Sequence, residues 1–96
     1  MNKWDCVVIG SGPCGISTAI YLKRYGFNPI VIGKESVSLK TAHKIENYYG
    51  IKSITGEDLY KGGIEQAKAL GIEVIYDEVI SIYFVDVIEV SCKTNK

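Results

Sequence analysis

Three glycines directly behind an apolar run constrain the fold of this chain more than any other feature. The run from Val7 to Ile9 ends at Gly10, and Gly12 and Gly15 complete the spacing Gly-x-Gly-x-x-Gly. In a dinucleotide site the first glycine allows a tight turn, the second lets a pyrophosphate approach the backbone, and the third lets helix and strand pack closely. The spacing alone is a weak signal, because glycine-rich turns recur by chance, so a purely structural turn is the alternative.

The residues on both sides of the glycines supply the context that makes the spacing specific. Residues 4–9 are apolar and rich in β-branched side chains, which predicts a strand buried on both faces. Pro13 stands where a first helical turn begins, and Gly26 stands where that helix would end. Residues 30–32, closed by Gly33, predict a second, parallel strand. Together these elements form a βαβ unit, the setting in which the glycine spacing indicates a dinucleotide site.

A second helix is predicted after a long polar stretch. Residues 34–54 show no periodicity, which indicates a loop of the kind that binds something or is disordered. Thr55 with Asp58 resembles a capping box and opens a helix that runs to about Leu70. Gly62 and Gly63 weaken this helix by about 1 kcal/mol each against alanine, so close packing against a neighbour is expected there. The expected shared face comprises Leu59, Gly63, Gln66, Ala67 and Leu70.

The remaining residues predict strands. Residues 72–76 read as a third parallel strand, and residues 79–92 as an antiparallel hairpin or meander with its turn near Asp86. The predicted fold class is therefore α/β, with a Rossmann-like βαβ unit and parallel sheet followed by a C-terminal β-hairpin or meander.

Composition and charge exclude several classes of function. The chain has 96 residues, the size of one domain, and eleven basic residues balance eleven acidic ones. This balance argues against nucleic acid or an anionic membrane as the partner. The apolar runs are far shorter than the roughly 20 residues that span a bilayer, and no signal peptide is visible, so a cytoplasmic protein is expected. The cysteines are odd in number and widely spaced, which supports neither a disulfide framework nor a metal site: Cys6, Cys14 and Cys92.

The dinucleotide fingerprint expects an acidic residue at the end of the second strand, where it holds a ribose hydroxyl. That position is Gly33, and the nearest carboxylate, Glu35, lies two residues into the loop. Glu35 either reaches the ribose or is a solvated loop carboxylate. The sequence therefore indicates a dinucleotide site but does not indicate which dinucleotide binds.

Two stretches, VVIGSGPCGISTAIYLKRYGFNPIVIGKE and KIENYYGIKSITGEDLYKGGIEQAKALGIEVI, carry a family resemblance. They resemble the N-terminal FAD-binding segment of low-molecular-weight thioredoxin reductases and related flavoproteins, the class II pyridine nucleotide-disulfide oxidoreductases. The specific part is the pairing of Gly-x-Gly-Pro-x-Gly with Glu46-Asn47-Tyr48-x-Gly50.

The resemblance implies FAD as the cofactor and assigns roles along the chain. Gly33, Lys34 and Glu35 would line the ribose, Asn47 would lie at the flavin end, and the backbone of Val79 would contact adenine. The pyrophosphate would be lined by Gly10, Ser11, Gly12, Pro13, Cys14 and Gly15.

The chain departs from the family at three places. Residues 36–38 are Ser-Val-Ser where the family has a glycine pair, and Tyr49 replaces the usual proline. The family continues into an NAD(P)H-binding domain, which carries the Cys-x-x-Cys in true thioredoxin reductases, and this sequence ends at Lys96. We therefore expect residues 1–96 to be a partial FAD-binding domain of an NAD(P)H-dependent flavoprotein, inactive alone and without catalytic residues. The alternative is a non-enzymatic nucleotide-binding or self-associating module, a homo-oligomer formed through an uncovered sheet edge.

Two side chains that could be reactive also have a purely structural interpretation. Cys14 lies at a predicted helix N-terminus, where the helix dipole favours thiolate, but a small packed residue is the more common role at this place. His43 is the only histidine and lies in the polar loop, where a solvated side chain outweighs a catalytic base.

Overall fold

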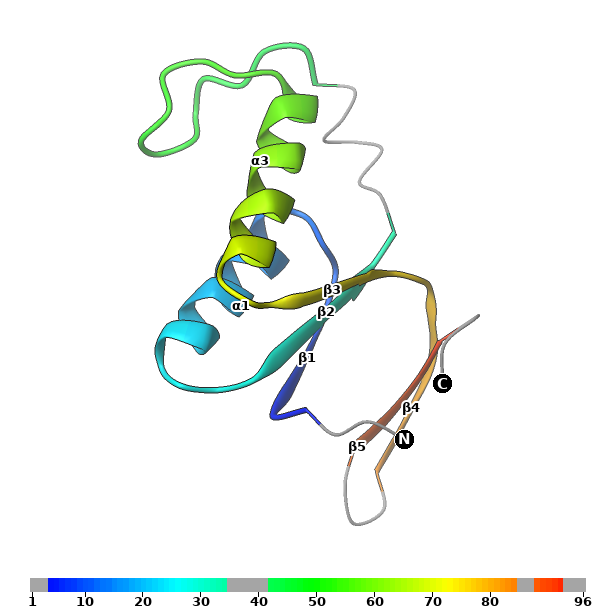
Figure 1. The fold of residues 1–96 in the computed structure, drawn as a ribbon. Helices are drawn as coiled ribbons and strands as arrows, with labels where there is room; N and C mark the ends of the chain where they lie inside the picture. Colours follow the sequence, from blue (N-terminus) through cyan, green and yellow to red (C-terminus); the bar gives the residue numbers. More distant parts are fainter. Residues whose placement is uncertain (1–3, 35–41, 85–87, 93–96) are drawn as a thin grey trace.

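The computed structural model describes residues 4–34, 42–84 and 88–92, and it confirms the predicted α/β fold class. The elements are, in chain order, β1 (Cys6–Ile9), α1 (Pro13–Arg24), β2 (Pro29–Gly33), α3 (Gly56–Ala69), β3 (Glu73–Tyr76), β4 (Val79–Phe84) and β5 (Ile88–Cys92). Helices α1 and α3 lie on one side of the parallel strands, and the β4–β5 hairpin lies on the other (Figure 1). The predicted turn near Asp86 falls on residues 85–87, outside the described residues.

The first three strands form a parallel sheet in the order β1-β2-β3. Val8 pairs with Val31, and Val31 pairs with Val74, so the carboxyl ends of all three strands meet at one edge. The last two strands form a separate antiparallel hairpin. Because ligands of open α/β sheets bind outside the carboxyl ends of the strands, this edge is where a site is expected.

The core on the helical side joins both helices to the sheet. Ile16 and Ala19 of α1 are buried against Val31 of the central strand. Helix α3 and the short segment between α3 and β3 contribute the other buried members, Tyr60, Ile64, Ala67 and Ile72. Burial of these side chains holds the N-terminus of α1 against the carboxyl edge of the sheet.

The core on the hairpin side is smaller and is centred on β2. Ile30 and Ile32 pack with Cys92 of β5, and the partly buried Ile75 of β3 joins them. Every residue of β2 is buried, as expected for a central parallel strand. The expectation that the first strand is buried on both faces is wrong: Val7 and Ile9 are 36% and 52% exposed, because β1 lies at the edge of the sheet and the buried members of this core come from β2 and β5.

The ends of the helices follow the predicted signals. Gly26 and Gly71, with φ of +91° and +80°, follow the last turns of α1 and α3. The Thr55 hydroxyl accepts a hydrogen bond from the Asp58 N–H at 3.2 Å, which caps α3.

The predicted face of α3 is only partly right. Ala67 is buried, but Gln66 and Leu70 are exposed, and the core face is instead Tyr60, Ile64 and Ala67. A β-carbon on Gly63 would lie in ordinary contact with Ile16, at 3.8 Å, whereas one on Gly62 would meet nothing within 4 Å. Both positions therefore have room for a β-carbon, and the expected close packing does not explain either glycine.

Apart from Lys34, the described part of the predicted loop comprises residues 42–54. Two isolated bridges tie the loop to itself, Ile45 to Ile54 and Tyr48 to Ile51. The Gly56 N–H donates to the Ala42 carbonyl at 2.7 Å, which fixes the loop at the start of α3.

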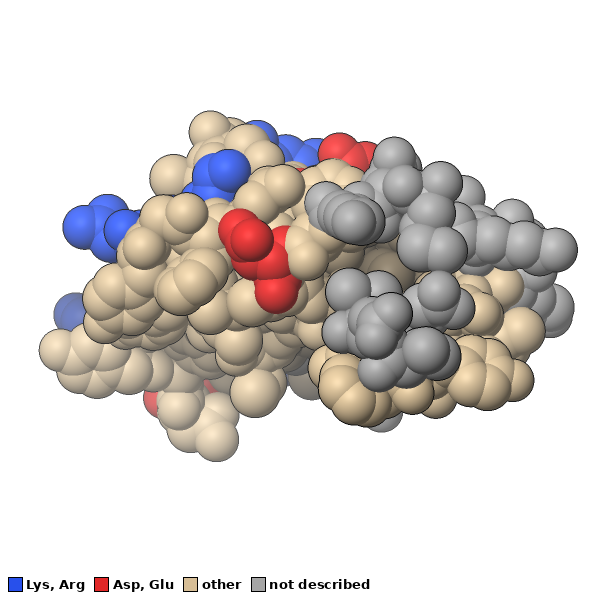
Figure 2. Space-filling model, turned by 90° about the horizontal axis from the view of Figure 1, so that it is seen from below, with Lys and Arg blue, Asp and Glu red and all other residues tan. Residues whose placement is uncertain are grey.

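Charged side chains are scattered on the face of the molecule that Figure 2 shows. On the face shown in Figure 2, blue and red groups are few, and the described residues form no patch of one sign. None of the helices in the described part of the chain is both long enough and apolar enough to cross a bilayer. Within the same residues, no cluster of His, Cys, Asp and Glu is suited to hold a metal ion.

Candidate nucleotide-binding site

The glycine turn between β1 and α1 has the geometry that its spacing predicts. Gly10 has φ of +117°, a conformation that side-chain-bearing residues rarely adopt, and its N–H donates to the Ile32 carbonyl at 2.8 Å. A β-carbon on Gly15 would collide with the Gly10 carbonyl oxygen, so helix and turn approach too closely for any side chain there. A β-carbon on Gly12 would meet nothing within 4 Å. The turn therefore leaves open space beside the backbone of its middle glycine.

The N-terminus of α1 faces this open space without a cap of its own. Gly12 is the N-cap residue and offers no side-chain hydrogen bond, and no acidic residue lies in the first turn. The N–H groups of a first helical turn have no partner within the helix, and they form the positive end of its dipole. Helix α3 differs, because Thr55, Glu57 and Asp58 supply its N-terminus with a hydroxyl cap and negative charge. The start of α1 is thus suited to an anion such as a phosphate.

The end of β2 packs directly on the glycine turn. A β-carbon on the buried Gly33 would lie 2.7 Å from the Ser11 nitrogen and 3.0 Å from its hydroxyl oxygen. The Ser11 hydroxyl donates to the Lys34 carbonyl at 3.0 Å and lies 3.5 Å from the hydroxyl of Tyr60. The structure thus brings Ser11, Gly33 and Lys34 together, whereas Glu35 lies outside the described residues.

The turn between β3 and β4 joins the same edge. The Asp77 N–H donates to the Gly33 carbonyl at 3.2 Å, and the buried Asp77 carboxylate accepts from the Glu78 N–H at 2.7 Å. The Lys34 ammonium forms an ion pair with the Glu78 carboxylate at 3.1 Å. Val79 follows at the start of β4, with its partly buried side chain in the hairpin-side core.

The two side chains with a possible reactive role lie at the surface. Cys14 is exposed in the first turn of α1, and its carbonyl accepts a hydrogen bond from the Thr18 hydroxyl at 2.8 Å. His43 is exposed in the loop, where the neighbouring Lys44 and Glu46 form an ion pair at 3.6 Å. Among the described contacts, none brings either side chain to a partner that would activate it, and the role of each stays a prediction.

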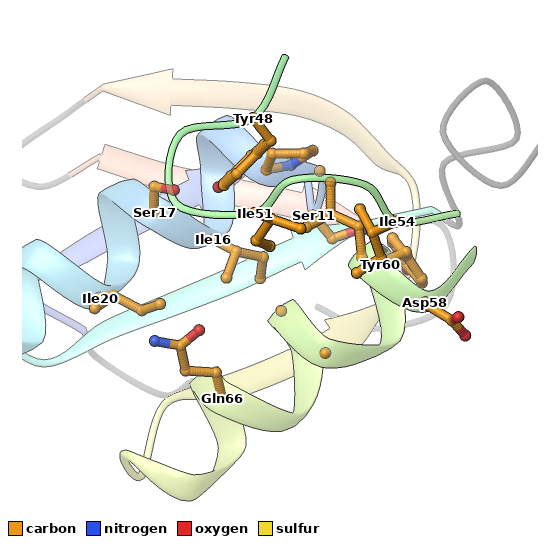
Figure 3. A pocket seen from close by; sticks show the side chains of 15 residues that line it. Ser11, Ile16, Ser17, Ile20, Tyr48, Ile51, Ile54, Asp58, Tyr60 and Gln66 are labelled. Carbon is orange, nitrogen blue, oxygen red and sulfur yellow. Dashed lines mark hydrogen bonds between the residues drawn. The ribbon is translucent and has the colours of Figure 1, made fainter. Parts of the chain in front are cut away.

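A cavity of about 260 Å³ lies between α1 and α3, beneath the 42–54 loop (Figure 3). It begins at Ser11, Gly12 and Pro13, so it is continuous with the glycine turn. Tyr48 and Ile51 close it from above, and Gly62 lines it from α3. Asn47, the residue before Tyr48, is exposed. Because Tyr48 lines the same cavity as Gly12 and Pro13, the 42–54 loop lies over the beginning of α1.

The sequence of this chain matches the pyridine nucleotide-disulphide oxidoreductase family over residues 4–95. The chain belongs to this family. It is homologous to the FAD-binding N-terminal part of thioredoxin reductase, as the resemblance implied.

Individual relatives agree with this membership. The thioredoxin reductase of Ureaplasma parvum is 41% identical over an alignment of 81 residues that covers 80% of this chain and 26% of the relative. The ferredoxin-flavin thioredoxin reductase of Clostridium acetobutylicum has a TM-score of 0.84 and 34% identity, over 96% of this chain and 33% of its own. The thioredoxin reductase of Giardia duodenalis, at 24% identity, shares the fold with a TM-score of 0.91, over 100% of this chain and 32% of its own. The chain thus spans between a quarter and a third of the length of these relatives.

Members of this family bind FAD, and the turn of this chain fits a dinucleotide diphosphate. The fit rests on the open space at Gly12 and on the uncapped N-terminus of α1. Sequence reasoning missed Tyr60, Asp77 and Glu78. Asp77 and Glu78 follow β3 at the carboxyl edge of a parallel sheet, and that place is itself a signal for a site. Tyr60 has no such signal, because only the packing of α3 brings its hydroxyl to Ser11.

Proposed function

We propose that this chain is the FAD-binding portion of an NAD(P)H-dependent, thioredoxin-reductase-like flavoprotein oxidoreductase. The observation that carries the proposal is the open backbone at Gly12, which faces an α1 N-terminus without a side-chain cap. A pyrophosphate has the negative charge and the size that such a turn accepts.

In this proposal, each segment of the site contacts a different part of FAD. The pyrophosphate lies on the glycine turn against residues 10–15, and the ribose lies at Gly33 and Lys34, with Glu35 beside them. The backbone of Val79 contacts adenine, and Asn47 lies at the flavin end. The hydrogen bonds from Ser11 to Lys34 and from Asp77 to Gly33 support this division, because they hold three segments together at one edge.

The bound flavin would supply hydride transfer, and this chain would supply binding and orientation. We propose that residues 1–96 are a partial FAD domain and that the NAD(P)H domain and the dithiol belong to the intact enzyme. The chain alone would then hold flavin without turnover, because the hydride donor would bind in that second domain and residues 1–96 contain no Cys-x-x-Cys. A cytoplasmic location accompanies the proposal, because the three cysteines are free thiols.

Titration of the purified chain with FAD tests the proposal. We expect saturable binding, read from flavin fluorescence and from calorimetry, and yellow protein after gel filtration. ADP should compete with FAD because it carries the same adenosine and diphosphate. Colourless protein that takes up no added FAD would overturn the proposal that this chain holds the cofactor.

A second candidate is a self-associating module. It is favoured by the outer edge of β1, which no strand of the described residues covers. Val7 and Ile9 are exposed on this strand, which carries no charged residue or proline. Edge strands without such protection pair with other chains. We expect sedimentation velocity to show a dimer or larger species that Ile9→Lys disperses. Tyr49→Lys, a control at an exposed aromatic residue of the loop, should leave the species unchanged. A monomer at all concentrations would contradict this candidate.

A further inference from the structure

An ion pair bridges the carboxyl ends of two neighbouring strands at the proposed ribose end of the site. Lys34 is the first residue after β2, and Glu78 lies in the turn between β3 and β4. Their charged atoms are 3.1 Å apart, and their side chains are 71% and 43% exposed. The pair is therefore accessible to a ligand that approaches this edge.

The backbone on both sides of the pair is fixed by hydrogen bonds. The Lys34 carbonyl accepts from the Ser11 hydroxyl at 3.0 Å. The Glu78 N–H donates to the Asp77 carboxylate at 2.7 Å, and the Asp77 N–H donates to the Gly33 carbonyl at 3.2 Å. The two charged side chains consequently project from anchored positions that adjoin both the glycine turn and Gly33.

The charge at the end of the second strand decides which ribose a dinucleotide site accepts. An acidic group there binds free ribose hydroxyls, whereas a basic group nearby accommodates a 2′-phosphate. Lys34 is a basic group at this place, and an ammonium is an effective point-charge partner for phosphate. Its pairing with Glu78 both neutralises that ammonium and places a carboxylate where it would repel a second anion.

We propose that Glu78 makes this edge selective for adenosine nucleotides with a free 2′-hydroxyl by holding Lys34 in the ion pair. Glu78 is then a specificity-determining residue of the proposed FAD site, and the inference rests on that proposed function. Without the Glu78 carboxylate, Lys34 is free to bind a 2′-phosphate, so the edge accepts 2′-phosphorylated nucleotides.

The test compares the affinities of ADP and 2′,5′-ADP, measured by calorimetry on the chain and its variants. The wild type should prefer ADP. In Glu78→Gln, the affinity for 2′,5′-ADP relative to ADP should rise about tenfold, because a repulsive charge is removed and a cation is released. The double variant Lys34→Met with Glu78→Gln should lose this gain, since no ammonium is left for the 2′-phosphate.

A matched control removes the same charge elsewhere. Glu57→Gln breaks a similarly exposed ion pair, that of Glu57 with Lys61 at 3.1 Å on α3, and it should leave the ratio unchanged. Thermal unfolding of each variant verifies that it is folded, as expected for exposed charges.

The outcomes separate this inference from the proposed function. If the wild type binds ADP and FAD but Glu78→Gln leaves the ratio unchanged, or Glu57→Gln shifts it equally, only the role of Glu78 is overturned. The same holds if the wild type already prefers 2′,5′-ADP. If the wild type binds none of these nucleotides, the proposed function and the inference both fall.

Discussion

Replacing Gly15 by alanine tests the geometry of the glycine turn directly. The new β-carbon would collide with the Gly10 carbonyl oxygen and lie 2.9 Å from the Gly10 carbonyl carbon. Both atoms are backbone, and Gly10 is tied to β2 by its hydrogen bond to Ile32, so the turn cannot yield by a side-chain rotation. Overpacking of this kind costs about 1–3 kcal/mol, and the rigid neighbours favour the upper end of that range. For a domain of this size, a loss of about 2–3 kcal/mol lowers the melting temperature by about 8–24 °C.

Gly12→Ala is the matched control for Gly15→Ala. Its β-carbon would meet nothing within 4 Å, and φ at Gly12 is an ordinary −75°. The expected loss of stability is therefore only that of a poorer N-cap, about 0.5–1 kcal/mol. The methyl group would nevertheless occupy the space proposed for the pyrophosphate, so FAD affinity should fall sharply while the protein stays folded. Thermal unfolding followed by circular dichroism compares the stabilities of the two variants, and FAD titrations compare their affinities. Equal melting temperatures for the two variants would refute the close contact at Gly15, and unchanged FAD binding by Gly12→Ala would refute the placement of the pyrophosphate.

The cysteines yield two further predictions. A thiol reagent under native conditions should label the exposed Cys14 readily and the 4% exposed Cys92 only on unfolding. Mass spectrometry of the labelled peptides measures both reactions. An unreactive Cys14 would remove any redox role for this residue. Burial, with a smaller contribution from Asp77, raises the pKa of the Cys92 thiol. The folded state thus holds this proton more tightly than the unfolded chain, so the stabilisation is complete below the unfolded pKa of about 8.5 and is lost as the pH rises through the folded pKa. Denaturant unfolding from neutral to alkaline pH should show a steeper decline for the wild type than for Cys92→Val, and parallel curves would contradict this origin.

Local signals predicted the elements of the fold, because each element begins and ends at residues with a strong conformational preference. Gly26 and Gly71 follow the helices as expected, and Thr55 caps α3. The error at β1 has a different origin. Its apolar residues match a buried strand, but burial depends on which strands lie beside it, and β1 is at the edge of the sheet. Periodicity likewise misassigned part of the α3 face, since apolar Leu70 is exposed just beyond the helix.

The part of the candidate site that one short segment forms was predictable from the sequence. The part that is assembled by packing of distant segments was not. The glycine turn follows from the spacing of Gly10, Gly12 and Gly15 and the strand before them. The contacts of Ser11 with Lys34 and of Lys34 with Glu78 join residues that are 23 and 44 positions apart. No local pattern encodes such pairs, because the parallel register of β1, β2 and β3 brings them to one edge.

The close packing at Gly33 explains why the charges proposed to read the ribose lie beyond β2 and not at its end. An aspartate or glutamate at position 33 would need a β-carbon 2.7 Å from the Ser11 nitrogen. To make room, the turn would have to move away from β2, and the hydrogen bond from Ser11 to the Lys34 carbonyl would be lost. The contact between Gly33 and the glycine turn is therefore incompatible with an acidic residue at position 33. Among the described residues, Lys34, the next residue of the chain, and Glu78, in the facing turn, bring charge to this edge. In the proposed site the choice of ribose would consequently depend on the ion pair between two turns, and Glu78→Gln is the single substitution that tests this dependence.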